Sequence, residues 1–194
     1  LMTLEATTGM IEAAGKLTLQ SGTGIVILDS MNGAATAQPL VVHADFESAG
    51  DGVLTVWTGK TVTSNKSDVS ITAWDIDLDG SLTAGTQTLS LHGAKVEQTI
   101  ALGATVKDMQ IEDEELQRVT ATGGLRVGGS MGGSVMVDGV TQLGSNTVLP
   151  LVTVVALADD AQALFSTAAS TFHTVAAQAD NGVVLDVDVS TTVN

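Results

Sequence analysis

Three carboxylates at alternate positions, Asp75, Asp77 and Asp79, form the most distinctive group of chemically active side chains. Carboxylate oxygens are the ligands that Ca²⁺ prefers, and the run opens like the calcium loop of an EF-hand. That loop needs a bidentate glutamate at its twelfth position, where this chain has Thr86. We therefore treat these three residues as weak calcium candidates and predict no other cofactor.

A β-strand explains the same alternation without a metal. Successive side chains of a strand point to opposite faces, so Ile76 and Leu78 would face the core while the three aspartates face solvent. Asp186 and Asp188 repeat this arrangement on a later strand. A cation would relieve the repulsion among the carboxylates, but solvated acidic faces are the simpler interpretation.

Two short motifs of catalytic or nucleotide-binding proteins are incomplete here. Residues 128–132 match the G-x-S-x-G nucleophile elbow around Ser130, but an elbow needs a following helix, and residues 135–137 alternate like a strand. Residues 58–61 match the end of a phosphate-binding P-loop, whose first glycine is replaced by Leu54. We predict turns at both places and no catalytic residue.

Histidine and tryptophan offer two further candidate sites. His43, His92 and His173 are too far apart in sequence for their spacing to indicate a metal site. Trp57 and Trp74 could stack against sugars, although packing at the edge of the fold is the simpler role for only two indoles.

The composition excludes several classes of partner. The 194 residues include 22 acidic and 7 basic residues, a net charge of −15. Phosphate backbones are bound by clustered cations, so we expect no nucleic-acid partner. No segment has the roughly 18 uninterrupted apolar residues of a membrane helix, so we expect no membrane insertion. A chain without cysteine has no disulfides.

Short alternating segments separated by Gly, Asp or Asn dominate the chain and predict an all-β fold. The clearest are residues 25–28, 53–57, 69–73, 135–137 and 183–189. Aromatic residues make up only 3% of the chain, which favours a narrow core of stacked aliphatic side chains. We expect Ile71, Ile76, Leu78, Leu82, Leu89 and Leu91 to point inward.

Degenerate copies of a strand–bend–strand pattern recur near residues 40–56, 69–86, 119–128 and 175–183. Irregular copies of short strands favour a parallel β-helix, or β-solenoid, over a propeller. With about 20–25 residues per coil, the whole of 1–194 would form one solenoid segment of about eight or nine coils. The Ala-rich stretch 155–169 fits a strand or a short peripheral helix near 156–168 about equally well.

Residues 111–121 (IEDEELQRVTA) with 125–129 (LRVGG) resemble a module of filamentous-haemagglutinin-like surface proteins. Residues 71–82 are similar to the same repeats, and the resemblance covers roughly 40–150. It implies a right-handed parallel β-helix and a role in adhesion or in the shaft of a surface fibre. It carries over no functional residue, because these repeats share a scaffold and not an active site.

The expected function is therefore a structural or adhesive module of a large extracellular or cell-surface protein, without catalysis. Residues 1–5 and 187–189 look like interior strands, so we expect an interior piece of a longer repeat protein. Its partners would be further copies, head to tail, or other surface and fibre proteins. The alternatives are a polysaccharide-acting β-helix enzyme and a calcium- or sugar-binding module.

Overall fold

The computed structural model describes residues 1–34 and 38–192, and their regular secondary structure is almost entirely β-strand, with two short helices. In chain order the elements are β1 (Met2–Leu4), β2 (Ile11–Glu12), β3 (Leu17–Gln20), β4 (Ile25–Ile27), β5 (Met31–Asn32), β6 (Leu40–His43), β7 (Val53–Val56), β8 (Thr61–Thr63), β9 (Val69–Ala73), β10 (Asp75–Leu78), β11 (Ser81–Gly85), β12 (Leu89–Gly93), β13 (Ile100–Gly103), β14 (Met109–Ile111), α1 (Asp113–Gln117), β15 (Val119–Ala121), β16 (Leu125–Gly129), β17 (Val135–Asp138), α2 (Gln142–Ser145), β18 (Val152–Ala156), β19 (Ala163–Phe165), β20 (Ser170–Phe172), β21 (Val175–Ala179), β22 (Val183–Leu185) and β23 (Val189–Thr191).

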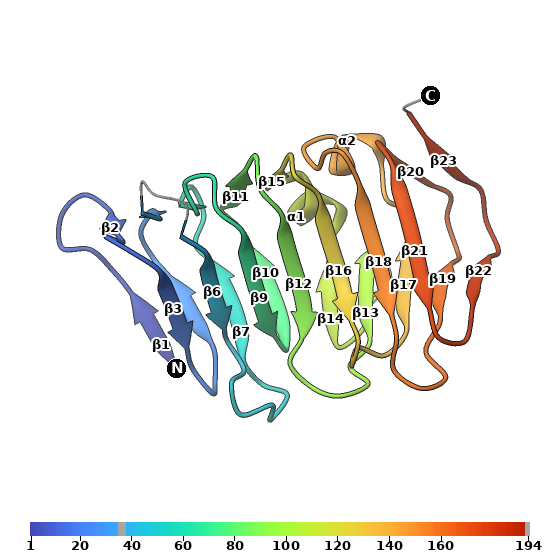
Figure 1. Ribbon diagram of the computed structural model, residues 1–194, viewed down its shortest axis with the longest axis horizontal. Helices are drawn as coiled ribbons and strands as arrows, with labels where there is room; N and C mark the ends of the chain where they lie inside the picture. Colours follow the sequence, from blue (N-terminus) through green and yellow to red (C-terminus); the bar gives the residue numbers. More distant parts are fainter. Residues whose placement is uncertain (35–37, 193–194) are drawn as a thin grey trace.

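The strands form five parallel sheets, which we name A to E (Figure 1). Sheet A has the order β1-β4-β7-β10, and sheet B has the order β15-β11-β8-β5-β2. Sheet C, the longest, has the order β21-β18-β16-β12-β9-β6-β3. Sheet D has the order β14-β13-β17-β19-β22, and sheet E pairs β20 with β23. The prediction of an all-β chain is confirmed.

The chain visits these sheets in a fixed cyclic order. From β3 to β12 it passes through C, A and B in turn. Afterwards D takes the place of A, and in the last two coils E takes the place of B. Helix α2 lies between a strand of D and a strand of C, at the step where earlier circuits pass through B. We call one such circuit a coil. Consecutive coils lie side by side along the long axis from the N-terminus to the C-terminus (Figure 1).

The coils differ in length while the pairing of sheet C stays in register. Successive paired positions in sheet C are separated by 23, 29, 20, 36, 27 and 23 residues, in the row Leu17, Leu40, Val69, Leu89, Leu125, Val152 and Val175. Three of these steps exceed the predicted 20–25 residues, so sheet C has seven strands among the described residues and not eight or nine. The 36-residue coil contains the additional strand β14 and helix α1.

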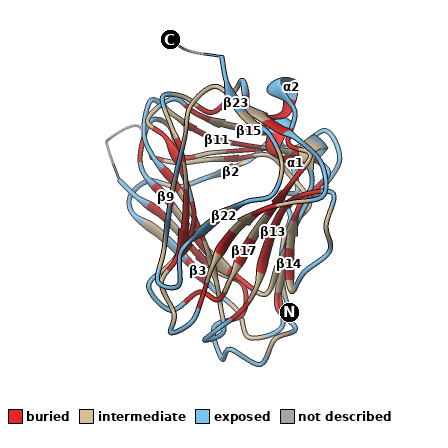
Figure 2. Ribbon diagram, turned by 90° about the vertical axis from the view of Figure 1, so that its right-hand side faces the viewer, coloured by how far each residue is buried: buried red, intermediate tan, exposed pale blue. Residues whose placement is uncertain are grey.

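Aliphatic rows fill the space between the sheets. The strands of these sheets carry most of the buried residues (Figure 2). In-register pairing places Val42, Ile71, Leu91, Val127 and Val154 next to one another across sheet C, each at most 1% exposed. The six residues predicted to point inward are 3% exposed or less, which confirms the facing of their strands. Burial of such rows is the main stabilising term of the fold.

The predicted alternative of a peripheral helix near 156–168 is wrong. Residues 152–156 form β18 and residues 163–165 form β19. Ala163 and Phe165 are buried on either side of a half-buried Leu164, which is the period of a strand. Pairing of β19 with both β17 and β22 decides the outcome, because an Ala-rich composition alone does not distinguish the two structures.

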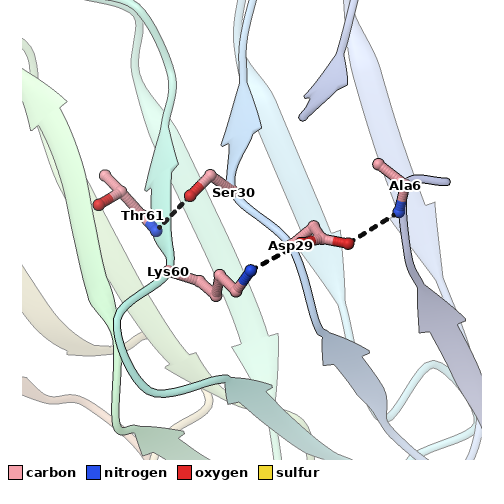
Figure 3. Close-up of polar contacts among 5 residues, drawn as sticks. All are labelled: Ala6, Asp29, Ser30, Lys60 and Thr61. Carbon is pink, nitrogen blue, oxygen red and sulfur yellow. Dashed lines mark hydrogen bonds and ion pairs between the residues drawn. The ribbon is translucent and has the colours of Figure 1, made fainter. Parts of the chain in front are cut away.

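Polar side chains tie consecutive coils together at the corner between sheets A and B (Figure 3). Asp29 Oδ2 accepts a hydrogen bond from Ala6 N in the preceding coil, at 3.0 Å. Its Oδ1 lies 2.7 Å from Lys60 Nζ in the following coil. The Lys60 ammonium lowers the pKa of Asp29, so the carboxylate stays charged. Thr61 N donates to Ser30 Oγ at the same corner, at 3.1 Å.

Candidate functional site: an acidic pocket between β10 and α1

The extra strand and helix of the 36-residue coil interrupt one face of the fold. Strand β10 is the last strand of sheet A, and β14 of sheet D lies next to it. We call the junction between β10 and the segment of β14 and α1 the seam. Side chains supply the hydrogen bonds across it. Asp75 Oδ1 accepts from Gln110 N at 2.9 Å and so joins the start of β10 to β14.

Helix α1 supplies the other two bonds of the seam, both to Leu78. Glu115 Oε1 accepts from the backbone N–H of Leu78 at 2.8 Å. Arg118 Nη1 donates to the backbone carbonyl of Leu78 at 2.7 Å. These two side chains satisfy the polar backbone groups that a neighbouring strand would bind in an unbroken sheet.

Local sequence positions Glu115 for this contact. The helix begins at Asp113, with Glu112 as its N-cap residue. Glu115 occupies the third helical position, and its Oε2 accepts from Glu112 N at 2.9 Å, which is the return bond of a capping box. One carboxylate therefore holds both the start of α1 and the end of β10.

A second carboxylate fixes α1 to the next coil. Asp113 Oδ1 accepts from Thr141 N at 2.8 Å, and Asp113 Oδ2 accepts from Thr141 Oγ1 at 2.6 Å. Thr141 is in turn the N-cap of α2, where its hydroxyl accepts from Gly144 N at 3.0 Å. The two helices are thus joined through their first turns, and α1 is held on both sides.

A pocket of about 380 Å³ lies along the seam. Its lining includes six carboxylates and one cation, Arg118: the carboxylates are Asp75, Asp77, Asp79, Glu112, Glu114 and Glu115. The three aspartates singled out in the sequence thus lie together with three glutamates from the segment around α1. The sequence did not reveal this second set, because its residues are about 35 positions away from the first.

Burial raises the pKa of two of these carboxyl groups. The pKa of Glu115 rises to about 7 because burial disfavours its charge more than the bonds from Leu78 and Glu112 favour it. The neighbouring charges of Glu112 and Asp75 raise it further. Burial also raises the pKa of Asp75, against the hydrogen bond from Gln110. Glu115 therefore titrates near neutral pH.

The arrangement does not favour the calcium hypothesis. Asp75 is half-buried and bonded to Gln110, whereas Asp77 and Asp79 are exposed. Within residues 1–34 and 38–192, no three His, Cys, Asp or Glu side chains are placed so that they could hold a metal ion. Calcium binding by Asp75, Asp77 and Asp79 stays a prediction.

The histidine and tryptophan candidates are spread over the fold. His43 and His92 belong to sheet C, on either side of Thr72, and His173 follows β20. Trp74 precedes β10 and Trp57 follows β7; because these strands pair in parallel, the indoles lie at opposite ends of the pair. They form no shared stacking surface.

The two incomplete motifs are turns, as predicted. Ser130 lies in the turn after β16, and the next element is strand β17, so the helix of a nucleophile elbow is missing. Residues 58–60 form the turn, with Gly59 at a φ of 73°, and Thr61 begins β8. Lys60 there pairs with Asp29.

The residues of the candidate site that the sequence did not predict are Gln110, Arg118 and the three glutamates around α1. A glutamate three positions after a polar N-cap signals a helix start, and Glu112 and Glu115 have this spacing. That signal identifies the short helix. It does not identify Leu78 as the partner, because this pairing depends on the additional strand β14.

No protein-family model, curated protein or solved structure matches this chain. Within the described ranges 1–34 and 38–192, no helix has both the length and the apolar character needed to cross a membrane.

Proposed function

We propose that this chain is a right-handed parallel β-helix that serves as a structural or adhesive segment of a large extracellular or cell-surface protein, without catalysis. The cyclic passage through parallel sheets supports the solenoid, and the resemblance to filamentous-haemagglutinin-like repeats supports its handedness and location. The observation that carries the role is the aliphatic core, which continues from coil to coil along the whole axis.

Such a core favours a load-bearing rod because each coil is stabilised mainly by its neighbours. The fold can then be extended in one direction by the addition of further coils. The acidic pocket between β10 and α1 does not favour an enzyme of the pectin-lyase kind, which needs cations beside its carboxylates. Its single cation, Arg118, is bonded to the backbone of Leu78.

The outermost coils present surfaces suited to self-association. Strands β1, β2 and β3 at one end and β21, β22 and β23 at the other each have one edge without a strand partner among the described residues (Figure 1). Apolar side chains of these coils are only partly buried, among them Met2, Leu4, Ile11, Leu17, Val175 and Val189. Unpaired edges and apolar surface together favour pairing with another chain, head to tail.

Light scattering on the isolated chain across a concentration series tests this proposal. We expect rod-like oligomers that grow with concentration, and more so at high salt, because salt screens repulsion between copies with a net charge of −15. Electron microscopy should show particles that lengthen at constant width. A strict monomer at both salt concentrations, or growth in width, would contradict the head-to-tail arrangement.

A further inference from the structure

A second region of interest lies on the outer face of sheet C, away from the acidic pocket. Two hollows of about 350 and 280 Å³ share one residue, Arg126 of β16. The first is lined by residues at the ends of their strands, such as His92, and by the turn after β16. The second is lined by residues at strand starts, such as Leu89 and Leu125. We call this pair the Arg126 hollows.

The lining of the Arg126 hollows differs in charge from the rest of the molecule. The chain has 22 acidic residues, yet neither hollow is lined by an aspartate or a glutamate. Arg126 is exposed, and no ion pair or hydrogen bond of the described residues engages its guanidinium. A guanidinium without a carboxylate partner is a ready binding group for an anion, because its planar donors match a carboxylate.

The neighbours of Arg126 keep it accessible. In-register pairing places Ser90 on one side of Arg126 and Thr153 on the other. Both side chains are small, so they leave the longer guanidinium uncovered. Their hydroxyls, with those of Thr72 and Ser130 in the lining, give the hollows a surface that can both donate and accept hydrogen bonds.

His92 adds a hydrogen-bond acceptor of defined orientation. Its Nδ1 lies 2.9 Å from the carbonyl oxygen of Gly128. A carbonyl oxygen can only accept, so Nδ1 carries the proton and Nε2 is the free ring nitrogen. Burial, together with the nearby charge of Arg126, lowers the pKa of His92, so the ring is neutral at pH 7. The free Nε2 of a neutral ring accepts a hydrogen bond from a hydroxyl.

We propose that the Arg126 hollows bind a hydroxylated carboxylate, the chemistry of a uronic acid residue in an acidic glycan. The carboxylate pairs with Arg126, a sugar hydroxyl donates to His92 Nε2, and further hydroxyls bond to the Ser and Thr side chains of the lining. Two hollows on either side of one cation suit a short oligosaccharide with its charged residue at the centre. This binding proposal does not rest on the structural role proposed for the chain.

Isothermal titration calorimetry with an acidic trimer, a galactose trisaccharide whose central residue is galacturonate, tests this proposal at physiological ionic strength, about 0.15 M salt. We expect wild-type protein to bind the acidic trimer at least tenfold more tightly than a neutral galactose trimer. Arg126→Gln should lower affinity for the acidic trimer about tenfold, to that of the neutral one. Lys107→Gln removes an equal charge from an exposed loop between β13 and β14, and it should retain wild-type affinity within about twofold.

Three outcomes would overturn the proposal. The first is no binding of the acidic trimer by wild-type protein at millimolar concentration. The second is an equal loss of affinity in Arg126→Gln and Lys107→Gln, which would assign the effect to net charge. The third is full displacement of the trimer by an equal concentration of acetate, which would show an anion site that does not recognise hydroxyls. Circular dichroism of both variants checks that each is folded.

Discussion

Glu115 Oε1 lies 2.8 Å from the backbone nitrogen of Leu78, a residue 37 positions earlier in the chain. This contact replaces a strand-to-strand hydrogen bond with a side chain that can gain a proton. The seam between β10 and α1 therefore responds to pH in a way that the regular sheets do not.

We expect the free energy of unfolding to fall as pH rises from 5 to 8, with Glu115 as one cause. Its pKa in the folded chain, about 7, exceeds the ordinary value of 4.5, so the folded state binds the proton more tightly. The stabilisation is complete below about pH 4.5 and is lost as pH rises through 7. After allowance for solvent screening, we expect a contribution of about 1–3 kcal/mol.

Urea denaturation of Glu115→Gln at several pH values measures this contribution. The variant should show a flatter stability profile between pH 5 and 8 than the wild type. Glu114→Gln is the matched control, since it removes a neighbouring exposed charge from the same helix and should keep the wild-type slope. Equal slopes in all three proteins would show that Glu115 does not titrate in this range.

A pair of adjacent substitutions in β10 tests the facing of its side chains. Ile76 is 3% exposed, so Ile76→Asp places an unpaired charge in an aliphatic row and should cost about 3–5 kcal/mol of stability. Asp77 is exposed, and Asp77→Ala should change stability by less than about 0.5 kcal/mol, with a slight gain expected from reduced repulsion. Chemical denaturation measures the free energy of unfolding of both variants. A similar loss of stability in the two would be incompatible with the observed facing of Ile76 and Asp77.

Gln98 joins two coils through both ends of its buried amide. Its Oε1 accepts from Ala94 N and Lys95 N, at 2.8 and 3.0 Å, and its Nε2 donates to the carbonyls of Ala73 and Trp74, at 3.2 and 2.7 Å. Gln98→Glu replaces the donor with an oxygen that faces two carbonyls. We expect a loss of about 2–4 kcal/mol at pH 7.

Thermal unfolding followed by circular dichroism measures this loss. Part of it should be recovered near pH 4, where a glutamic acid regains one donor. Gln178→Glu makes the same chemical change at an exposed position of β21 and should have little effect. An equal effect of the two substitutions would mean that the added charge, and not the lost donor, is responsible.

The strands and their buried faces could be predicted because alternation is a local property of the sequence. Alternation alone assigned Ile71, Leu89 and Leu91 to the core, without information about distant residues. The segment near Ala163 could not be assigned in this way, because small residues fit a helix or a strand. There the pairing with β17 and β22, two coils distant from each other, determined the structure.

The candidate site was predictable only in part. Asp75, Asp77 and Asp79 were recognisable as a group, since one strand carries all three. Their neighbours around α1 were not, because the coil that brings them together is 36 residues long and contains a strand that other coils lack. No signal in the sequence indicated Arg126, because its proposed role depends on the absence of acidic side chains from the two hollows that it lines.

The unequal length of the coils has a practical consequence. Steps of 20 and 36 residues fit sheet C with its pairing in register, so the segments between its strands can differ in length without shifting that pairing. A foreign peptide inserted at an exposed corner, such as the turn at Gly59, should leave the adjoining rows of the core intact. The fold thus offers a linear series of attachment points, spaced by the roughly 4.8 Å that separates neighbouring strands, for the ordered display of epitopes or enzymes.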